Sequence, residues 1–335
     1  MVTMKDVAKA AGVSTATVSA VLAGTSYVSP ALKARVEVAV AELGYAPNSM
    51  ARSLKTGQSN LVGLIVPDIT NPFFTAFVDR VQAEMARNSY AVLLGISDND
   101  TAREAGLLGL MRSHLAAGTI LCPAGEAERY AALEKNLGGM KLVLADNAAP
   151  HGASDTVIID NRGAALLAAR HLISNGHKRI AAMLGPRHRH NSAERWNGFR
   201  AAMEEAGLAL PDAYVLHGAF REDEAHTEAA TLLGRDPLPT AIFVANNLML
   251  IGVMKAVAER RLRVPDDISI VSIDDFAWAS AFQPALTVVR QPITAMADAA
   301  VMRVIARIQG DQSPPQSLVL PPELLVRGST RSLHR

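Results

Sequence analysis

The polar residues that could bind a ligand lie in short clusters, each directly after an apolar run of the chain. These clusters are Asp68 to Asn71, Asp98 to Asp100, Asp146-Asn147, Asn246-Asn247 and Asp274-Asp275. Open α/β sheets bind ligands beyond the carboxyl ends of their strands. If the apolar runs are strands of two sheets that face each other, these side chains line the cleft between the sheets.

A second candidate group is the basic run Arg187-His188-Arg189-His190, which could bind a metal or a phosphate. Two histidines two positions apart on a loop, without a nearby cysteine, favour a solvated loop over a metal site. We therefore expect no metal ion. We take Arg189 as a ligand contact and leave Arg187 and His188 open.

Catalytic chemistry has little support in the sequence. Asp146 and Asp160 could form a carboxylate pair for acid–base catalysis, but no nucleophile motif accompanies them. The phosphate-binding patterns G-x-G-x-x-G after the first body strand and G-x-x-x-x-G-K-[ST] are absent, and so is G-x-S-x-G. We expect a binding protein that is not an enzyme and needs no cofactor.

The elements that must position these residues follow from the hydrophobic pattern beyond Leu61. Apolar runs occur at 61–66, 90–96, 118–122, 141–145, 179–184, 240–245 and 268–273. Amphipathic stretches suited to helices fill the gaps, at about 73–88, 101–115, 126–137, 161–175, 192–206, 221–233, 247–261 and 292–309. This alternation predicts an α/β fold with parallel, doubly wound sheets. The repeat is too long for one sheet, so we expect two subdomains that divide near Asp160-Asn161.

The N-terminal segment Thr3–Gly24 predicts two short helices joined by a tight turn. Thr3 and Asp6 fit a capping box, Gly12 suits a left-handed C′ position, and Ser14 can cap the second helix. One small core can form from Val7, Ala11, Val13, Val18, Val21 and Leu22. The second helix leaves outside Thr15, Ala16, Thr17 and Ala20. This layout is typical of a helix-turn-helix whose second helix enters the major groove of DNA.

A third helix and a connecting segment complete the N-terminal part. Ser29-Pro30 favours a helix start, and Gly44 a helix end. The apolar stripe of this helix consists of Leu32, Val36, Val40 and Leu43. Asn48–Lys55 is compatible with a helix but is marginal alone. We therefore divide the chain into a headpiece (1–46), a hinge helix and linker (47–60) and a body (61–335). The body's first subdomain is about 61–160 plus 291–320, and its second about 161–290 plus 321–335.

Composition limits the possible classes of protein. The chain has 335 residues, of which 49% are hydrophobic, which suits two or three folded domains. The single cysteine, Cys122, excludes a disulfide framework and fits a reducing cytoplasm. We find no signal-peptide core and no apolar run of spanning length, so we expect a cytoplasmic protein without membrane contact. Residues 1–60 carry six basic and three acidic side chains, an excess that suits a head contacting phosphate.

These motifs together resemble the lactose/galactose-repressor (LacI/GalR) family of bacterial transcription factors, along nearly the whole chain. The resemblance rests on Lys5-Asp6-Val7-Ala8, Gly12-Val13-Ser14, Thr17-Val18-Ser19, Val28-Ser29, Gly44 to Asn48, Ala51-Arg52-Ser53-Leu54, Asn71-Pro72-Phe73-Phe74, Gly176-His177, Val264-Pro265 and Ser272 to Asp275. It implies a homodimer with helix-turn-helix headpieces, hinge helices and a body like periplasmic sugar-binding proteins. It also implies that binding of an effector changes the affinity for a pseudo-palindromic double-stranded operator.

The resemblance also suggests roles for individual residues. The family's base-reading positions match Thr15, Ala16 and Ala20, and its minor-groove wedge matches Leu54. The full set of DNA contacts that we expect also includes Thr17, Ser29, Asn48, Arg52 and Lys55. Positions that line the family's effector cleft match Phe73, Arg189, Asn191, Arg195, Phe220, Asn246 and Asp274. We add Asp146 to the expected effector contacts as a polar residue of the cleft. We expect Phe73 to face the cleft, and Phe74 or Phe77 to lie in the core. The chain departs from the family at Ala20, where many members have a long polar side chain, and at Asn247, where aspartate is common.

The expected function is a repressor of a carbohydrate-utilisation operon. Aromatic faces together with arginine and aspartate suit a neutral sugar, while the basic run leaves a sugar acid or sugar phosphate as the main alternative effector and a purine as the third. A sugar-binding protein of a transport system, with the same body fold, is the alternative function. No heptad repeat follows the strand-like tail Ser313 to Val326, so we expect a dimer instead of a tetramer.

Overall fold

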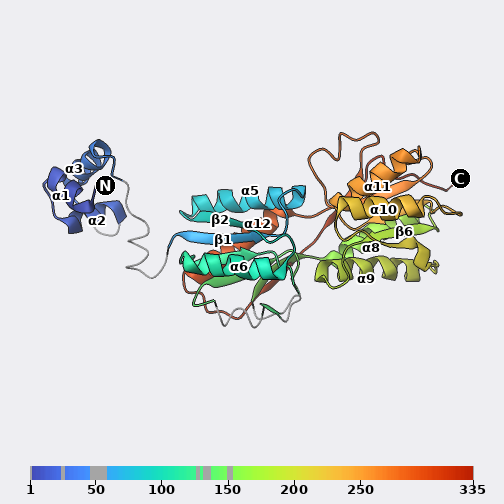
Figure 1. Cartoon of the computed structure of the whole chain (residues 1–335), viewed down its shortest axis with the longest axis horizontal. Coiled ribbons are helices and arrows are strands. Elements are labelled where there is room, and N and C mark those ends of the chain that lie inside the picture. The colour runs from blue at the N-terminus through green and yellow to red at the C-terminus, as the bar shows by residue number, and fades with distance from the viewer. Residues whose placement is uncertain are drawn as a thin grey trace. The chain divides into compact units, whose positions relative to one another are not determined.

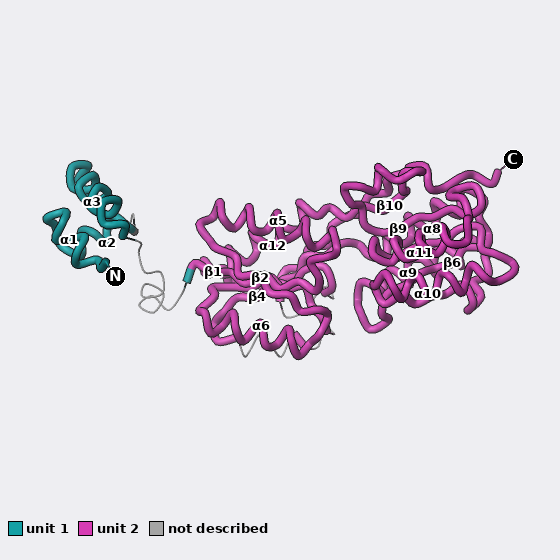
Figure 2. Tube along the Cα trace, turned by 45° about the horizontal axis from the view of Figure 1, so that its top comes forward, with its two compact units in different colours: residues 1–59 teal, residues 60–335 magenta. Residues whose placement is uncertain are grey.

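The computed structural model describes residues 2–23, 27–45, 59–125, 129–130, 137–148 and 154–334. The chain divides into two compact units, Met1–Ser59 and Asn60–Arg335, which are coloured separately in Figure 2. The hinge contacts expected at Asn48, Arg52, Leu54 and Lys55 fall outside the described residues. Among the described helices, none has both the length and the hydropathy needed to cross a bilayer.

The first unit contains α1 (Met4–Ala11), α2 (Thr15–Ala23) and α3 (Pro30–Glu42). The capping box of α1 is confirmed, because the Thr3 hydroxyl accepts from the Asp6 amide while the Asp6 carboxylate accepts from the Thr3 amide. Gly12 ends α1 with φ of 61°, as expected. Ser14 Oγ accepts a hydrogen bond of 3.1 Å from the Thr17 amide at the start of α2.

The headpiece core lies between the three helices. Val7, Val18 and Val36 are fully buried. The other members of this cluster are Met4, Ala8, Ala11, Val13, Val21, Leu22, Ala39, Val40 and Tyr45. The prediction for Leu43 was wrong: it is exposed, because α3 ends at Glu42 and Ala39 supplies the inward-facing side chain one turn earlier. Ser29 occupies the N-cap position of α3 but makes no capping bond with its side chain.

The body's first sheet has six parallel strands in the order β11-β5-β4-β3-β1-β2. They are β1 (Leu61–Val66), β2 (Ala91–Ile96), β3 (Gly118–Leu121), β4 (Lys141–Ala145), β5 (Asp155–Ile159) and β11 (Ser317–Leu320). Helices α5 (Pro72–Arg87) and α12 (Ile293–Ile308) lie on one face, and α6 (Thr101–Ser113) lies on the other (Figure 1). Because strand side chains alternate, Leu64 joins the core under α5, whereas Ile65 joins the core under α6.

The second sheet has the order β12-β10-β9-β8-β6-β7. Its strands are β6 (Ile180–Leu184), β7 (Val215–His217), β8 (Ala241–Val244), β9 (Ser269–Ile273), β10 (Thr287–Arg290) and β12 (Glu323–Leu325). The surrounding helices are α8 (Asn161–Ser174), α9 (His190–Glu205), α10 (Glu222–Leu232) and α11 (Asn247–Glu259), and a short 3-10 helix, η1 (Asp212–Tyr214), precedes β7. The edge strand β12 runs antiparallel to β10, so this sheet is not wholly parallel.

The chain passes from one sheet to the other after β5, after β10 and after β11. The sequence pattern indicated seven of the strands and a strand-like tail that contains β11 and β12, but it missed β5, β7 and β10. Two of these are only three and four residues long, too short to display a clear period. Two of the missed strands, β5 and β10, lead directly into crossovers.

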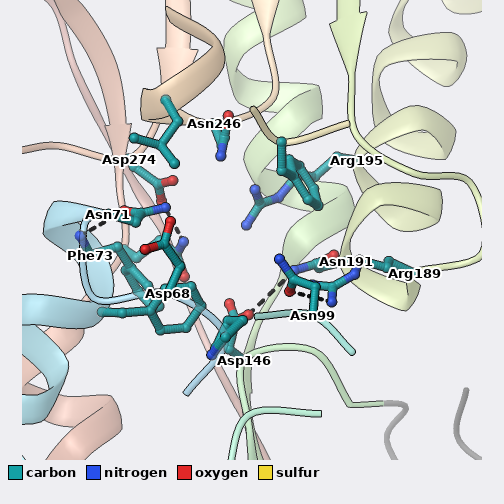
Figure 3. Close-up of a pocket in the computed structure, with 15 residues that line it drawn as sticks. Asp68, Asn71, Phe73, Asn99, Asp146, Arg189, Asn191, Arg195, Asn246 and Asp274 are labelled. Atoms are coloured by element: carbon teal, nitrogen blue, oxygen red, sulfur yellow. Dashed lines mark hydrogen bonds between the residues drawn. The ribbon is translucent and has the colours of Figure 1, made fainter. Parts of the chain in front are cut away.

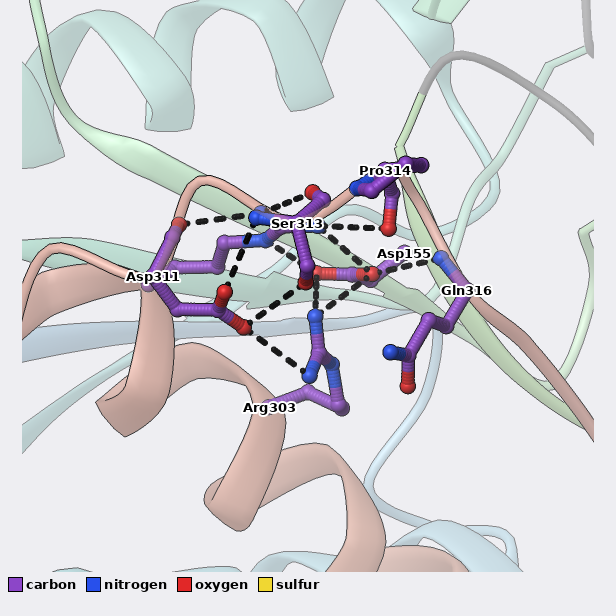
Figure 4. Close-up of polar contacts among 7 residues, drawn as sticks. Asp155, Arg303, Asp311, Ser313, Pro314 and Gln316 are labelled. Atoms are coloured by element: carbon purple, nitrogen blue, oxygen red, sulfur yellow. Dashed lines mark hydrogen bonds and ion pairs between the residues drawn. The ribbon is translucent and has the colours of Figure 1, made fainter.

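An ionic cluster around the buried carboxylate of Asp155 anchors β5 and β11 (Figure 4). The Asp155 carboxylate at the start of β5 accepts from Arg303 Nη2 (3.1 Å) and Arg307 Nε (2.7 Å) of α12. It also accepts from the amide of Gln316 (2.8 Å), directly before β11. Burial alone would raise the pKa of Asp155, but these hydrogen bonds hold it below its ordinary value. The starts of β5 and β11 are therefore tied to one helix.

Candidate functional site

A polar pocket lies where the carboxyl ends of strands from both sheets meet (Figure 3). Its empty volume, counted to its open mouth, is about 460 Å³. The lining side chains come from loops that follow strands, such as Asn99 after β2, Asp146 after β4, Asn246 after β8 and Asp274 after β9. This position is the one at which open α/β sheets bind ligands.

The structure brings together around this pocket all the side chains that we expected to contact the effector. They are Phe73, Asp146, Arg189, Asn191, Arg195, Phe220, Asn246 and Asp274. The set of expected contacts did not include seven further lining residues: Pro67, Asp68, Asn71, Phe74, Asn99, Leu248 and Gln291. Asp68, Asn71 and Asn99 belong to the polar clusters after strands, so that signal could have found them.

Aromatic side chains supply the apolar faces of the pocket. Phe73 and Phe74 both line it and meet edge to face, with their ring centroids 4.9 Å apart. Phe77 lies in the core and is 1% exposed. Phe220 approaches from the other subdomain on a backbone with φ of 61°. A Cβ placed on Gly185 would lie 2.3 Å from the Phe220 ring, so the ring needs a glycine at position 185.

The guanidinium of Arg195 is fixed from behind and points into the pocket (Figure 3). Its Nε donates to Asn161 Oδ1 (2.9 Å), and its Nη1 donates to the Ala245 carbonyl (2.6 Å). The guanidinium carbon lies 6.0 Å from the centroid of the Phe220 ring. These contacts hold Arg195 in one orientation before any ligand arrives.

Several hydrogen bonds cross the cleft between the subdomains. Arg189 Nη2 donates to Asn99 Oδ1 (2.5 Å), and Asn191 Nδ2 donates to Asp146 Oδ2 (3.4 Å). Asn247 Nδ2 donates to Asn71 Oδ1 (3.0 Å). The described arrangement is thus a closed cleft held by polar contacts between the two halves.

The two deepest carboxylates have perturbed acidity. Burial raises the pKa of Asp146 to about 6, with Arg195 opposing the rise and Asp274 adding to it. Burial likewise raises the pKa of Asp274, although Arg195 and a 2.5 Å hydrogen bond from Gln291 Nε2 oppose it. Both residues have left-handed backbones, with φ of 63° and 77°. Non-glycine residues with such angles often mark functional sites.

Two buried acceptors of the pocket lack a protein partner. Asn191 Oδ1 and Gln291 Oε1 make no hydrogen bond within the described part of the chain. Buried polar atoms are nearly always hydrogen-bonded, so such atoms need a physical reason. A ligand that carries hydroxyl donors would satisfy both.

Other polar candidates have different places in the structure. Asp160 caps α8 by accepting from the Gly163 amide (2.7 Å), and it does not line the pocket beside Asp146. His177 bonds Thr240 and a backbone carbonyl, which is a structural role. Arg187 and His188 also lie away from the pocket lining. The described residues contain no group of three His, Cys, Asp or Glu side chains that could hold a metal ion.

The candidate DNA-contacting helix is α2. Thr15 and Ala16 are exposed, whereas Thr17 and Ala20 are partly buried. The Thr17 hydroxyl lies 2.9 Å from the Ser14 hydroxyl, so Thr17 helps to form the turn. The free surface at the start of α2 is therefore formed by small side chains with methyl groups, which suit contact with thymine methyls more than bidentate base recognition.

Comparisons with known proteins cover both units. Residues 3–48 match the family described as bacterial regulatory proteins, lacI family, and residues 169–330 match a periplasmic binding protein-like domain. The ribose operon repressor of Escherichia coli (strain K12) is 36% identical over 330 residues, covering 98% of this chain and all of that protein.

Two solved structures extend the comparison. A Lac repressor dimer bound to operator and the anti-inducer ONPF has a TM-score of 0.90 at 26% identity, covering 98% of this chain and 99% of that one. A LacI family transcriptional regulator from Enterococcus faecium with bound ribose has a TM-score of 0.73 at 26% identity, covering 82% of this chain and all of that one.

Proposed function

The chain belongs to the lacI family of bacterial regulatory proteins, and we propose that it represses a carbohydrate operon under the control of a neutral pentose. The observation that carries the choice of effector is the charge of the pocket. Three carboxylates line it, from Asp68, Asp146 and Asp274, against the two guanidinium groups of Arg189 and Arg195. A phosphate or carboxylate would enter a site with an excess of acidic groups, whereas hydroxyl groups can donate to these acids.

The engagement of the arginines supports the same choice. Arg195 already donates to Asn161 and to a backbone carbonyl, and Arg189 donates to Asn99. A guanidinium group binds an anion most strongly when it donates two parallel hydrogen bonds to it. The basic run that had favoured an anionic effector contributes only Arg189 to the lining.

The aromatic lining of the pocket and the relatives narrow the class of sugar. Phe73 and Phe220 offer faces for the C–H surfaces of a sugar ring. A ribose operon repressor and a ribose-bound regulator are among the similar proteins, so ribose is our first choice.

The rest of the mechanism follows the family. We propose that two copies pair as the Lac repressor dimer does, so that two α2 helices meet the half-sites of a pseudo-palindromic operator. We propose that Leu54, which lies outside the described residues, inserts into the minor groove as a wedge. The protein would act in the cytoplasm, where operator DNA lies, and it would catalyse no reaction. Closure of the cleft around the sugar would change operator affinity by linkage, in either direction.

Calorimetry on the full-length protein tests the effector. We expect saturable heat with D-ribose and none with ribose 5-phosphate or hypoxanthine. Asp274→Asn should weaken ribose binding at least tenfold, because a carboxylate that accepts from hydroxyls becomes an amide. Asp266→Asn makes the same change at an exposed position and should bind like the parent. Preferential binding of the phosphate or the purine would overturn the proposal.

Operator binding tests the regulatory part. An operator is first selected from random duplexes with the full-length protein, and its affinity is then measured with and without ribose. We expect a sequence-specific complex of two chains per duplex, with an affinity that ribose changes at least fivefold. An affinity that ribose leaves unchanged would contradict the proposed control.

A further inference from the structure

The side chain of Arg187 lies in a groove of its own, outside the sugar pocket. This groove runs along α9 and the edge strand β7, and its empty volume to the open side is about 920 Å³. It is lined by Arg187, Trp196, Arg200, Met203, Glu204, Leu208, Leu210, Asp212, Val215 and His217. No step of the proposed regulation uses any of these side chains.

The floor of the groove is apolar. On α9, Trp196, Arg200 and Met203 stand four and three positions apart, so they share one face of the helix. The Trp196 ring stacks on Phe199, with centroids 6.3 Å apart and an interplanar angle of 23°. Trp196 is only partly buried, so it offers a fixed aromatic surface to the groove.

One end of the groove carries the exposed guanidinium of Arg187. Arg187 follows β6, and His217 is the last residue of β7, which runs parallel to β6. Both residues therefore lie at the carboxyl ends of these strands. Arg187 is exposed, and its Nη2 lies 3.4 Å from His217 Nε2. Partial desolvation, and then the charge of Arg187, lower the pKa of His217, which favours the neutral ring that can accept from the guanidinium.

Within the described chain, Arg187 forms no ion pair with a carboxylate, and its side-chain contact is with His217. The charge of Glu228, on α10, also acts on His217 but comes from outside the lining of the groove. Glu204 pairs with Arg200 at 3.4 Å, with both side chains more than half exposed, and such a surface pair contributes little energy. Asp212 precedes β7 and therefore lies toward the amino end of this strand, whereas His217 lies at its carboxyl end.

We propose that this groove is a second binding site, for a small organic anion with a flat apolar group. Its phosphate or carboxylate would meet Arg187, because guanidinium groups bind such anions with charge-assisted hydrogen bonds. Its apolar part would lie on Trp196 and the aliphatic floor beyond it. Charge and apolar surface are thus arranged in the order that an aromatic phosphate or acid requires.

The groove shares its supports with the sugar pocket. The loop after β6 carries Arg187 to the groove and Arg189 to the pocket. Helix α9 carries Trp196 to the groove and Arg195 to the pocket. An anion in the groove can therefore act on the same elements that hold the sugar.

Phenyl phosphate is the probe that tests this site. The chain has two tryptophans, Trp196 and Trp278, so Trp278→Phe leaves Trp196 as the only tryptophan fluorophore. In this background we expect a saturable change in fluorescence with phenyl phosphate, and at least tenfold weaker binding of inorganic phosphate and of phenol. Arg187→Gln should weaken the binding of phenyl phosphate at least fivefold.

Two control variants distinguish binding in this groove from binding in the sugar pocket and from attraction to surface charge. Lys178→Gln removes one positive charge from an exposed position of the same subdomain and should leave the titration unchanged. Asp274→Asn damages the sugar pocket and should also leave it unchanged. Loss of the signal in Asp274→Asn, equal binding by the Arg187→Gln variant and its parent, or no saturable change at all would each overturn the proposal.

Discussion

Asn247, the first residue of α11, donates through Nδ2 to Asn71 Oδ1 across the cleft, at 3.0 Å. The same Asn71 oxygen accepts from the Phe73 amide at 2.9 Å and so caps α5. One acceptor therefore joins the start of a helix in the first subdomain to the start of a helix in the second. Both asparagines are buried, at 6% and 2% exposure, so water offers little competition for this contact.

The hydrogen bond between Asn247 and Asn71 predicts the effect of Asn247→Asp. Aspartate is the residue that is common at this position in the family. An ionised aspartate cannot donate, so two acceptors would face each other in the closed cleft. We expect ribose affinity to fall about tenfold, about 1.4 kcal/mol, because the closed arrangement loses a buried hydrogen bond. Calorimetry measures this change. Gln82→Glu makes the same type of change on the exposed face of α5 and should leave ribose affinity unchanged. Equal ribose affinities for the two variants would show that Asn247 does not help to hold the cleft closed.

The close contact between Gly185 and the Phe220 ring predicts that Gly185→Ala weakens ribose binding. A methyl group there would meet the Phe220 ring at 2.3 Å, so the ring must leave its place in Gly185→Ala. We expect ribose binding to weaken about five- to tenfold, the value of about 1 kcal/mol for a lost aromatic contact. In a double-mutant cycle, Phe220→Ala should add little to Gly185→Ala. Gly106→Ala, where a Cβ meets open space, is the matched control. Full additivity in the cycle would show that the ring had not moved.

Much of this pocket could be predicted because its residues follow strong strand signals. Asp146, Asn246 and Asp274 each end a buried apolar run, and the topology rule places such ends together. The aromatic pair was harder. Phe73 and Phe74 are adjacent on a helix, yet both line the pocket, because the loop end of α5 lies against the cleft and not over the middle of the sheet.

Other features depended on contacts that periodicity does not encode. Gln291 follows the four-residue strand β10, whose pattern is too short to detect, so its arrival at Asp274 could not be predicted. Asn99 bonds Arg189, ninety residues away and in the other subdomain. Partners of this kind are set by the packing of two subdomains, whereas local pattern fixes only the elements within each.

In the headpiece, we predict that replacing Arg35 weakens DNA binding because it destabilises the folded headpiece. Its Nη2 donates to the carbonyls of Ala11 (2.6 Å) and Gly12 (3.2 Å), and so fastens α3 to the turn before α2. We expect Arg35→Met to destabilise the headpiece by about 2 kcal/mol, because these bonds have a charged donor. Hydrogen exchange across residues 7–13 should accelerate and operator affinity should fall, while ribose binding stays unchanged. Lys33→Met removes an equal charge from the exposed face of α3. Equal losses in the two variants would assign the effect to charge alone.

Asp146 predicts how stability depends on pH. Burial raises its pKa in the folded protein to about 6, from an ordinary value of 3.8. Between these values the folded state binds more protons than the unfolded state, so the contribution of Asp146 is fully present below about pH 3.8 and is lost as pH rises through about 6. The shift corresponds to about 3 kcal/mol. Relative to the Asp146→Asn variant, the parent should therefore lose about 2 to 3 kcal/mol of unfolding free energy between about pH 4 and pH 7. Urea unfolding of both proteins across this range measures the difference, with Asp266→Asn as an exposed control. A difference that stays constant with pH would show that Asp146 ionises normally in the closed cleft.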